Sequence, residues 1–154
     1  MNIYKNLENL GLSLPEPPAI PAGLTGVKML CENVLYVSGC GCIIENKGFR
    51  GKVGTEVSLE EAKLAARDTI LNFLALLEQH IGDLNRVESF VKLLVFVASS
   101  PDFFEQPAVA NGATELLIDV FGLEIGCPSR SAVGVAVLPG NIAVEIEGIV
   151  KIKG

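Results

Sequence analysis

The chain is expected to fold as an α+β domain in which a mixed β-sheet carries two helices on one face. Three observations predict this fold class. Apolar residues recur with helical spacing in two segments. Five other segments have the β-branched or alternating character of strands. The segments follow one another in the order β-β-α-β-α-β-β, and 154 residues suffice for one domain with a substantial core.

The N-terminal part is expected to form a leader, residues 1–26, ahead of a single domain, residues 27–154. Asn2 to Leu10 has the character of a short helix. Four prolines follow, and each fixes φ and disfavours helix at the preceding residue: Pro15, Pro17, Pro18 and Pro21. The leader is therefore expected to run extended over the surface of the domain.

The domain opens with two strands. Val34 to Gly39 is rich in β-branched and aromatic residues, which is typical of a strand. Val27 to Cys31 is expected to pair with it through a turn at Glu32-Asn33. Several glycines after Gly39 indicate loops and tight turns.

Ser58 to Ile81 is the clearest helix of the sequence. Ser58 with Glu61 three residues later forms a capping box, in which each side chain bonds a backbone N–H of the first turn. Gly82 follows as a C-terminal stop. Apolar residues recur at spacings of three and four, as in an amphipathic helix: Ala62, Ala66, Ile70, Phe73, Leu77 and Ile81.

The second half predicts a long strand, a helix and two more strands. Val87 to Ser99 is expected to be central in the sheet, because both of its faces are apolar toward its C-terminal end. One face is expected to hold Val87, Val91, Leu93, Val95 and Val97, and the other Phe90, Leu94 and Phe96. The second helix runs from Pro107 to Gly122. Residues 131–138 and 142–152 then predict a hairpin joined through Pro139-Gly140-Asn141.

Composition indicates an oligomer. Hydrophobic residues make up 49% of the chain and charged residues 19%. No further helix is available to cover the second, also apolar, face of the sheet. Packing against copies of the same chain is therefore expected.

Charge and hydropathy exclude several classes of protein. The net charge of −6 and the absence of a basic run argue against nucleic acid as the main partner. No apolar stretch reaches the roughly 20 residues that span a bilayer, and residues 1–14 do not resemble a signal peptide. A cytoplasmic protein without a membrane partner is expected.

The four cysteines are expected to be free thiols, because disulfides are rare in the cytoplasm. Cys40-Gly41-Cys42 lacks the C-x-x-C spacing of zinc and redox motifs, and the single histidine, His80, lies about forty residues away. Buried thiols that pack in the core are favoured over a metal site.

One cation and two carboxylates stand out near the C-terminus. Arg130 lies at the mouth of the predicted hairpin, and Glu145 and Glu147 share one face of its second strand. A charge on apolar strands is costly unless it is paired or used. Arg130 therefore either braces the scaffold through a glutamate or binds an anionic small molecule. In a simple hairpin Arg130 and Glu145 would lie about 15 Å apart, so one ligand could touch both only across a subunit boundary.

Several motifs resemble the RidA/YjgF family in their order and spacing, over roughly residues 20–152. They are Leu35-Tyr36-Val37-Ser38-Gly39, Pro101-Asp102-Phe103, Pro128-Ser129-Arg130-Ser131-Ala132-Val133, and Leu138-Pro139 followed by Val144-Glu145-Ile146-Glu147. The resemblance implies a chorismate-mutase-like fold and a homotrimer with ligand clefts between subunits. It also implies hydrolysis of reactive 2-imino or 2-enamino acids to 2-keto acids and ammonia, without metal or cofactor. Gly51-Lys52-Val53-Gly54 is more similar to a separate branch of the family than to its well-studied deaminases.

The resemblance implies roles for individual residues. Arg130 matches the arginine that holds the substrate carboxylate, and Glu145 matches the glutamate that positions the attacking water. Asn111 and Ser38 match polar positions that line the cleft, and Cys127 lies next to the proposed substrate site. The sequence departs from the family where Cys40 replaces a frequent glutamine, and residues 21–26 stand where a tyrosine-bearing loop is usual.

Plainer roles remain open for the same residues. Asn111 could solvate a helix face, and Ser38 could bond the backbone at the end of its strand. Cys127 has no histidine nearby to activate it as a nucleophile. Three functions follow: an imine or enamine deaminase, a non-catalytic protein that binds a small carboxylate in the same intersubunit cleft, and, least favoured by the charge, an RNA-cleaving activity.

Overall fold

The computed structural model describes residues 2–154. The strands of this part of the chain form one five-stranded mixed sheet. The strands are β1 (Val27–Cys31), β2 (Val34–Gly41), β3 (Val87–Ala98), β4 (Ser129–Val135) and β5 (Val144–Ile152). Their spatial order is β1-β2-β5-β3-β4. β3 and β4 run parallel, whereas the other neighbouring pairs are antiparallel. The predicted α+β class is therefore confirmed.

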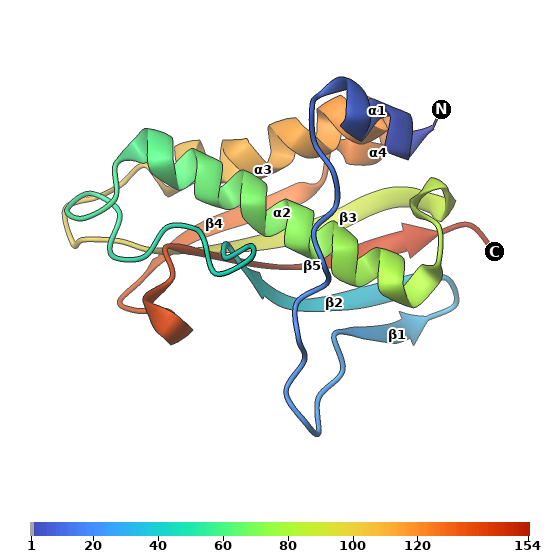
Figure 1. Ribbon diagram of the computed structural model, residues 1–154, viewed down its shortest axis with the longest axis horizontal. Coiled ribbons are helices and arrows are strands. Elements are labelled where there is room, and N and C mark those ends of the chain that lie inside the picture. The colour runs from blue at the N-terminus through green and yellow to red at the C-terminus, as the bar shows by residue number, and fades with distance from the viewer. Residues whose placement is uncertain (1) are drawn as a thin grey trace.

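Two long helices cover one face of the sheet, as predicted. They are α2 (Leu59–Ile81) and α3 (Gln106–Phe121), and both lie on the same side of the strands in Figure 1. Two shorter helices, α1 (Ile3–Asn9) and α4 (Leu123–Gly126), and two 3₁₀ turns, Leu84–Arg86 and Pro139–Asn141, complete the fold. Three phenylalanine rings join the layers in the core. The ring centroid of Phe90 on β3 lies 6.4 Å from that of Phe73 on α2 and 4.9 Å from that of Phe121 on α3.

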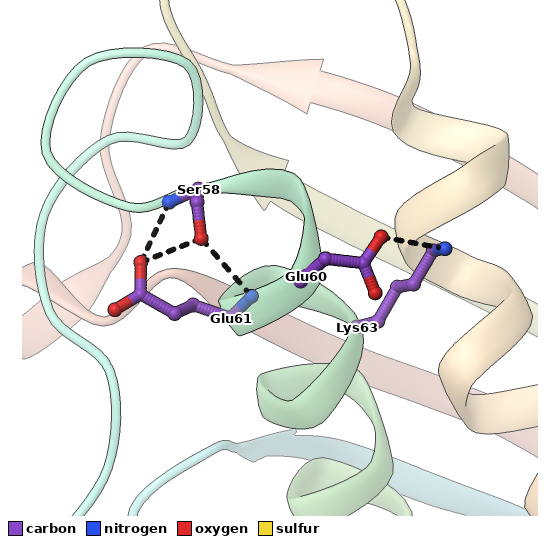
Figure 2. Close-up of polar contacts among 4 residues, drawn as sticks. All are labelled: Ser58, Glu60, Glu61 and Lys63. Carbon is purple, nitrogen blue, oxygen red and sulfur yellow. Dashed lines mark hydrogen bonds and ion pairs between the residues drawn. The ribbon is translucent and has the colours of Figure 1, made fainter.

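Local sequence signals fix both ends of α2. The Glu61 backbone N–H donates to Ser58 Oγ over 3.3 Å, and the Ser58 N–H donates to Glu61 Oε2 over 2.8 Å, as Figure 2 shows. This is the predicted capping box. Gly82 ends the helix with φ 79°, a left-handed conformation that glycine adopts at little cost.

The leader packs against both long helices. Ile3 and Leu7 of α1 are buried, and the Asn6 side-chain amide donates to the carbonyl of Val120 at the end of α3 over 2.7 Å. The extended part then crosses α2 on its way to β1 (Figure 1). Gly26, just before β1, lies against the Leu76 side chain of α2. Residues 11–25 of the leader are half-buried or exposed.

The predicted hairpin between the last two strands is wrong. β3 lies between β4 and β5, so these two strands pair with β3 and not with each other. The reason is that α3 carries the chain over the sheet and returns it parallel to β3, as a crossover between parallel strands requires. The connection, which contains the 3₁₀ turn Pro139–Asn141, then passes the end of β3 instead of joining two paired strands.

The alternation predicted for β3 is also wrong in its first half. Phe90 is buried and Val91 is 43% exposed, the reverse of the expectation. The pairing of β3 with β5 shifts between Val87 and Ser89 and again between Phe90 and Lys92. Each irregularity changes which face the following residues occupy. From Leu93 onward the predicted alternation holds.

The cysteines are all free thiols. Cys40 and Cys42 are buried, as predicted, whereas Cys31 and Cys127 are exposed. Within residues 2–154 no helix is both long and apolar enough to span a bilayer.

Candidate functional site

Arg130 lies on the helix-covered side of the edge strand β4. It pairs with Leu93, which is fully buried beneath the helices. Residues paired across neighbouring strands share a face of the sheet. The Arg130 side chain therefore points toward α3.

Three hydrogen bonds fix the Arg130 guanidinium on α3. Nη1 donates to Asn111 Oδ1 and to Thr114 Oγ1, each over 3.0 Å. Nη2 donates to the carbonyl oxygen of Pro107 over 3.2 Å. Pro107, Asn111 and Thr114 are spaced by four and three residues, so they form one stripe of the helix. We call Arg130 with these three residues the helix-side cluster.

The guanidinium keeps donors for a ligand. A guanidinium has five N–H groups, and α3 accepts three of them. Within residues 2–154, Nε and one hydrogen of Nη2 have no acceptor. Burial lowers the pKa of Arg130, and the nearby Glu115 carboxylate acts in the opposite direction. Because arginine stays charged in proteins, the cluster presents a fixed positive charge.

Glu145 lies on the opposite, open face of the sheet. Its neighbours on β5, Val144 and Ile146, are fully buried under the helices, so the alternation of the strand points Glu145 away from them. Its carboxylate lies against Gly39 of β2, and a side chain at position 39 would require the glutamate side chain to move. Burial raises the pKa of Glu145, and the negative charge of Glu147 raises it further.

A β-bulge lies beside the position of Glu145. The pairing of β2 with β5 shifts between Val37 and Cys40, so Ser38 and Gly39 together oppose Glu147, whereas Glu145 pairs with Gly41. Such bulges re-aim side chains and are common next to active sites. The Ser38 side chain is exposed, while its backbone N–H donates to the carbonyl of Gly26 over 2.8 Å. We call Ser38, Gly39 and Glu145 the open-face cluster.

The carboxylate of Glu147, two residues after Glu145 on β5, is hydrogen-bonded to the hydroxyl of Tyr36. Tyr36 Oη donates to Glu147 Oε1 over 2.7 Å. This bond, with burial, raises the pKa of Tyr36. Glu147 thus has a partner on its own face, and neither glutamate forms an ion pair with Arg130 in the described part of the chain.

The structure brings some predicted site residues together and separates others. Arg130 pairs with Leu93 and Glu145 with Phe96, three residues apart on β3. Their Cα atoms therefore lie about 14 Å apart and their side chains leave opposite faces of the sheet. The spacing resembles the expectation, but the geometry differs because β3 stands between the two strands. The Arg130 side chain contacts Asn111, and the Glu145 carboxylate lies against Gly39, the residue after Ser38.

Cys127 joins neither cluster. It is exposed between α4 and β4, and residues 2–154 give its thiol no hydrogen-bond partner. The residues that the sequence reasoning missed are Thr114 and Pro107, which hold Arg130, and Gly39, which admits Glu145. The spacing of four and three residues between Pro107, Asn111 and Thr114 predicts that all three lie on the same face of a helix. Once Asn111 is a candidate, this spacing indicates the other two residues. No three of the described His, Cys, Asp and Glu residues gather closely enough to hold a metal ion.

A protein-family model agrees with this architecture. The model described as Endoribonuclease L-PSP matches residues 22–152. Among curated proteins, Protein TCP17 of Trypanosoma cruzi is 41% identical over 159 residues, which cover 98% of this chain and 94% of that protein.

Solved structures divide into two degrees of similarity. The protein Atu1372 of Agrobacterium tumefaciens, described as having unknown function, is 38% identical with a TM-score of 0.91, covering 98% of this chain and 92% of its own. RidA from Psychrobacter is 27% identical with a TM-score of 0.58, covering 91% and 96%. The overall geometry therefore agrees more closely with Atu1372 than with RidA.

Proposed function

Because the chain belongs to the Endoribonuclease L-PSP family, which is the RidA/YjgF family, we propose that it hydrolyses reactive 2-imino and 2-enamino acids. Water adds to the carbon of the C=N bond, the C–N bond breaks, and ammonia leaves with the transferred protons. The products are a 2-keto acid and ammonia. The imine carbon is already electrophilic, so positioning and proton transfer supply the catalysis.

The helix-side cluster is the single observation that carries this proposal. Three bonds to α3 orient the Arg130 guanidinium before any ligand arrives. The remaining Nε and Nη2 donors suit the two oxygens of a carboxylate, an arrangement that lysine does not reproduce.

Glu145 is proposed to position the attacking water and to carry its proton. Burial raises the pKa of Glu145 toward neutral pH. A carboxyl group whose pKa lies nearer the working pH transfers protons more efficiently. The adjacent Ser38 hydroxyl and the bulge at Gly39 would line the same pocket.

The reacting groups are proposed to come from different copies of the chain. Arg130 and Glu145 leave opposite faces of one sheet, so a single small ligand cannot touch both within one copy. A cytoplasmic homotrimer would bring the open face of one copy against the β4 edge of the next, completing three equivalent clefts.

The experiment generates an imine in the cuvette with an amino-acid oxidase and traps it with semicarbazide. Wild-type protein is expected to slow semicarbazone formation by consuming the imine, and Arg130→Ala is expected to lose this effect. Arg50→Ala is the matched control, because Arg50 is exposed and forms no side-chain bond in the described chain. No effect of the wild-type protein on any 2-imino acid rejects the proposed reaction.

A non-catalytic role is the alternative, and the same helix-side cluster favours it. Its three bonds do not involve Glu145, so carboxylate binding could persist without turnover. Calorimetry with 2-keto acids separates the two functions. Binding that disappears in Arg130→Ala, without imine turnover by the wild type, favours the binding protein.

The family description also names an endoribonuclease. RNA binding depends on basic side chains that neutralise phosphates. The chain carries 12 basic and 18 acidic residues, so we propose a metabolite and not RNA as the substrate.

A further inference from the structure

A cavity lies between α2, α3 and the leader, and it approaches the helix-side cluster only at Glu115, whose carboxylate lies near Arg130. Its volume is about 270 Å³, slightly below the roughly 300–1,000 Å³ of typical pockets for drug-sized ligands. Four leucines form its apolar lining: Leu10 and Leu12 of the leader, Leu64 of α2 and Leu116 of α3. We call this cavity the interhelical groove.

The two helices bring opposite charges to the groove. Lys63 and Arg67, one turn apart on α2, face Glu115 and Asp119, one turn apart on α3. No ion pair within residues 2–154 joins the two helices across this gap. Lys63 instead contacts Glu60 of its own helix over 3.0 Å (Figure 2), and Arg67 Nη2 lies 3.6 Å from Asp68.

One donor in the groove has no partner. The Nε atom of Arg67 is buried and makes no hydrogen bond in the described chain. A buried N–H without an acceptor is costly, and such groups in native proteins usually have a ligand, a water or a functional reason.

Backbone packing fixes the width of the groove. Gly112 of α3 lies directly against the carbonyl of Lys63, and any side chain at position 112 would overlap it. The backbones of α2 and α3 are therefore in contact at Gly112. Packed helix axes generally lie about 8–10 Å apart, depending on the side chains between them. On the leader side, the Leu12 N–H donates to the carbonyl of Leu7 over 2.9 Å, which fixes the turn bearing Leu10 and Leu12.

We propose that the interhelical groove binds a free α-amino acid with an apolar side chain. Its carboxylate accepts from the exposed part of the Arg67 guanidinium and approaches Lys63. Its ammonium group lies between Glu115 and Asp119, and its side chain contacts the leucines. A free amino acid has an ammonium group and a carboxylate attached to the same carbon. These two groups suit the basic residues of α2 and the acidic residues of α3, which form no ion pair with each other in the described chain. This site shares α3 with the helix-side cluster but uses a different stripe of that helix.

Titration calorimetry with L-leucine, L-isoleucine, L-valine, L-methionine and L-phenylalanine tests the proposal. At least one is expected to bind at micromolar to millimolar concentration. For the amino acid that binds, the N-acetyl derivative and the matching amine without a carboxylate each lack one charge. Both are expected to bind at least about tenfold more weakly.

Variants then assign the site. Arg67→Gln and Asp119→Asn are each expected to weaken binding at least about tenfold, with Arg50→Gln as the unchanged control and thermal melting as the check on folding. Arg130→Ala is expected to bind normally, which keeps this site distinct from the proposed catalytic cleft. No binding by any of the five, unchanged binding in both charge variants, or loss of binding in Arg130→Ala overturns the proposal.

Discussion

Arg130 and Glu145 lie on the two strands that flank β3, yet the molecule fixes them in different ways. Arg130 is held by a helix: three acceptors on one stripe of α3 orient its guanidinium. Glu145 is placed by the sheet: it pairs with Gly41, and its carboxylate lies against Gly39 in the bulge of β2. The first arrangement fixes a charge in a defined direction. The second raises a pKa by partial burial.

The comparison indicates different roles for Arg130 and Glu145. A pre-oriented cation suits recognition of a carboxylate, because little entropy is lost on binding. A partly desolvated carboxyl group suits proton transfer. Since the two groups face away from each other in one chain, their cooperation depends on assembly. Variants on each side should therefore change different kinetic parameters.

The largest effect is expected from Glu145→Gln. The amide cannot accept the proton of the attacking water, so kcat should fall by about 10²–10⁴-fold while KM changes little. Imine-trapping kinetics provide the measurement. Glu147→Gln is the matched control on the same strand and face, and an equal loss of kcat in that variant would contradict a specific role for Glu145.

Arg130→Lys is expected to have the next largest effect. Lysine keeps the positive charge but loses the planar fork and the bonds to α3. KM should rise by about 10²-fold, with a smaller change in kcat. Carboxylate binding by calorimetry should weaken in parallel. A lysine variant with wild-type KM would show that charge alone suffices and that orientation by α3 is irrelevant.

Thr114→Val tests the orientation directly. The substitution removes one acceptor of Arg130 and leaves the arginine in place. We expect KM to rise by about tenfold, since a bond to a charged group contributes about 1.5–3 kcal/mol. Thr114→Ser restores the hydroxyl and should restore KM. Failure of serine to rescue would assign the defect to packing of α3.

The smallest effect concerns stability against pH. The folded-state pKa of Glu145 is raised by burial and by Glu147, so the native state holds this proton more tightly than the unfolded state. Ionised Glu145 therefore destabilises the fold near neutral pH, and this destabilisation disappears as the pH falls below the unfolded value of about 4.3. Glu145→Gln should raise the melting temperature near neutral pH but not below about pH 4. A higher melting temperature for the wild type near neutral pH would reverse the inferred sign.

Local signals in the sequence predicted most of the elements. The capping box at Ser58 and the turn at Glu32-Asn33 are encoded within a few residues, so α2 and the β1–β2 pair followed directly. The position of β4 did not, because strand order depends on contacts between residues far apart in sequence. An apolar strand followed by a short turn predicts a hairpin, and only the crossover by α3 makes β4 parallel to β3.

The candidate site was predictable in its residues but not in its arrangement. Arg130 and Asn111 were singled out, and they do lie together. Thr114 was missed because a threonine on a helix has no distinctive spacing until its partner is known. The irregularities of β3 changed which face Phe90 and Val91 occupy, and no residue type marks such a shift.

The most direct test mixes two inactive variants, Arg130→Ala and Glu145→Gln, under conditions of subunit exchange verified by native mass spectrometry. If each cleft takes Arg130 from one copy and Glu145 from the next, an equal mixture of trimers contains about one quarter intact clefts. Imine hydrolysis should then return to about a quarter of the wild-type rate. A verified mixture that stays as inactive as its two parents would contradict a site shared between copies.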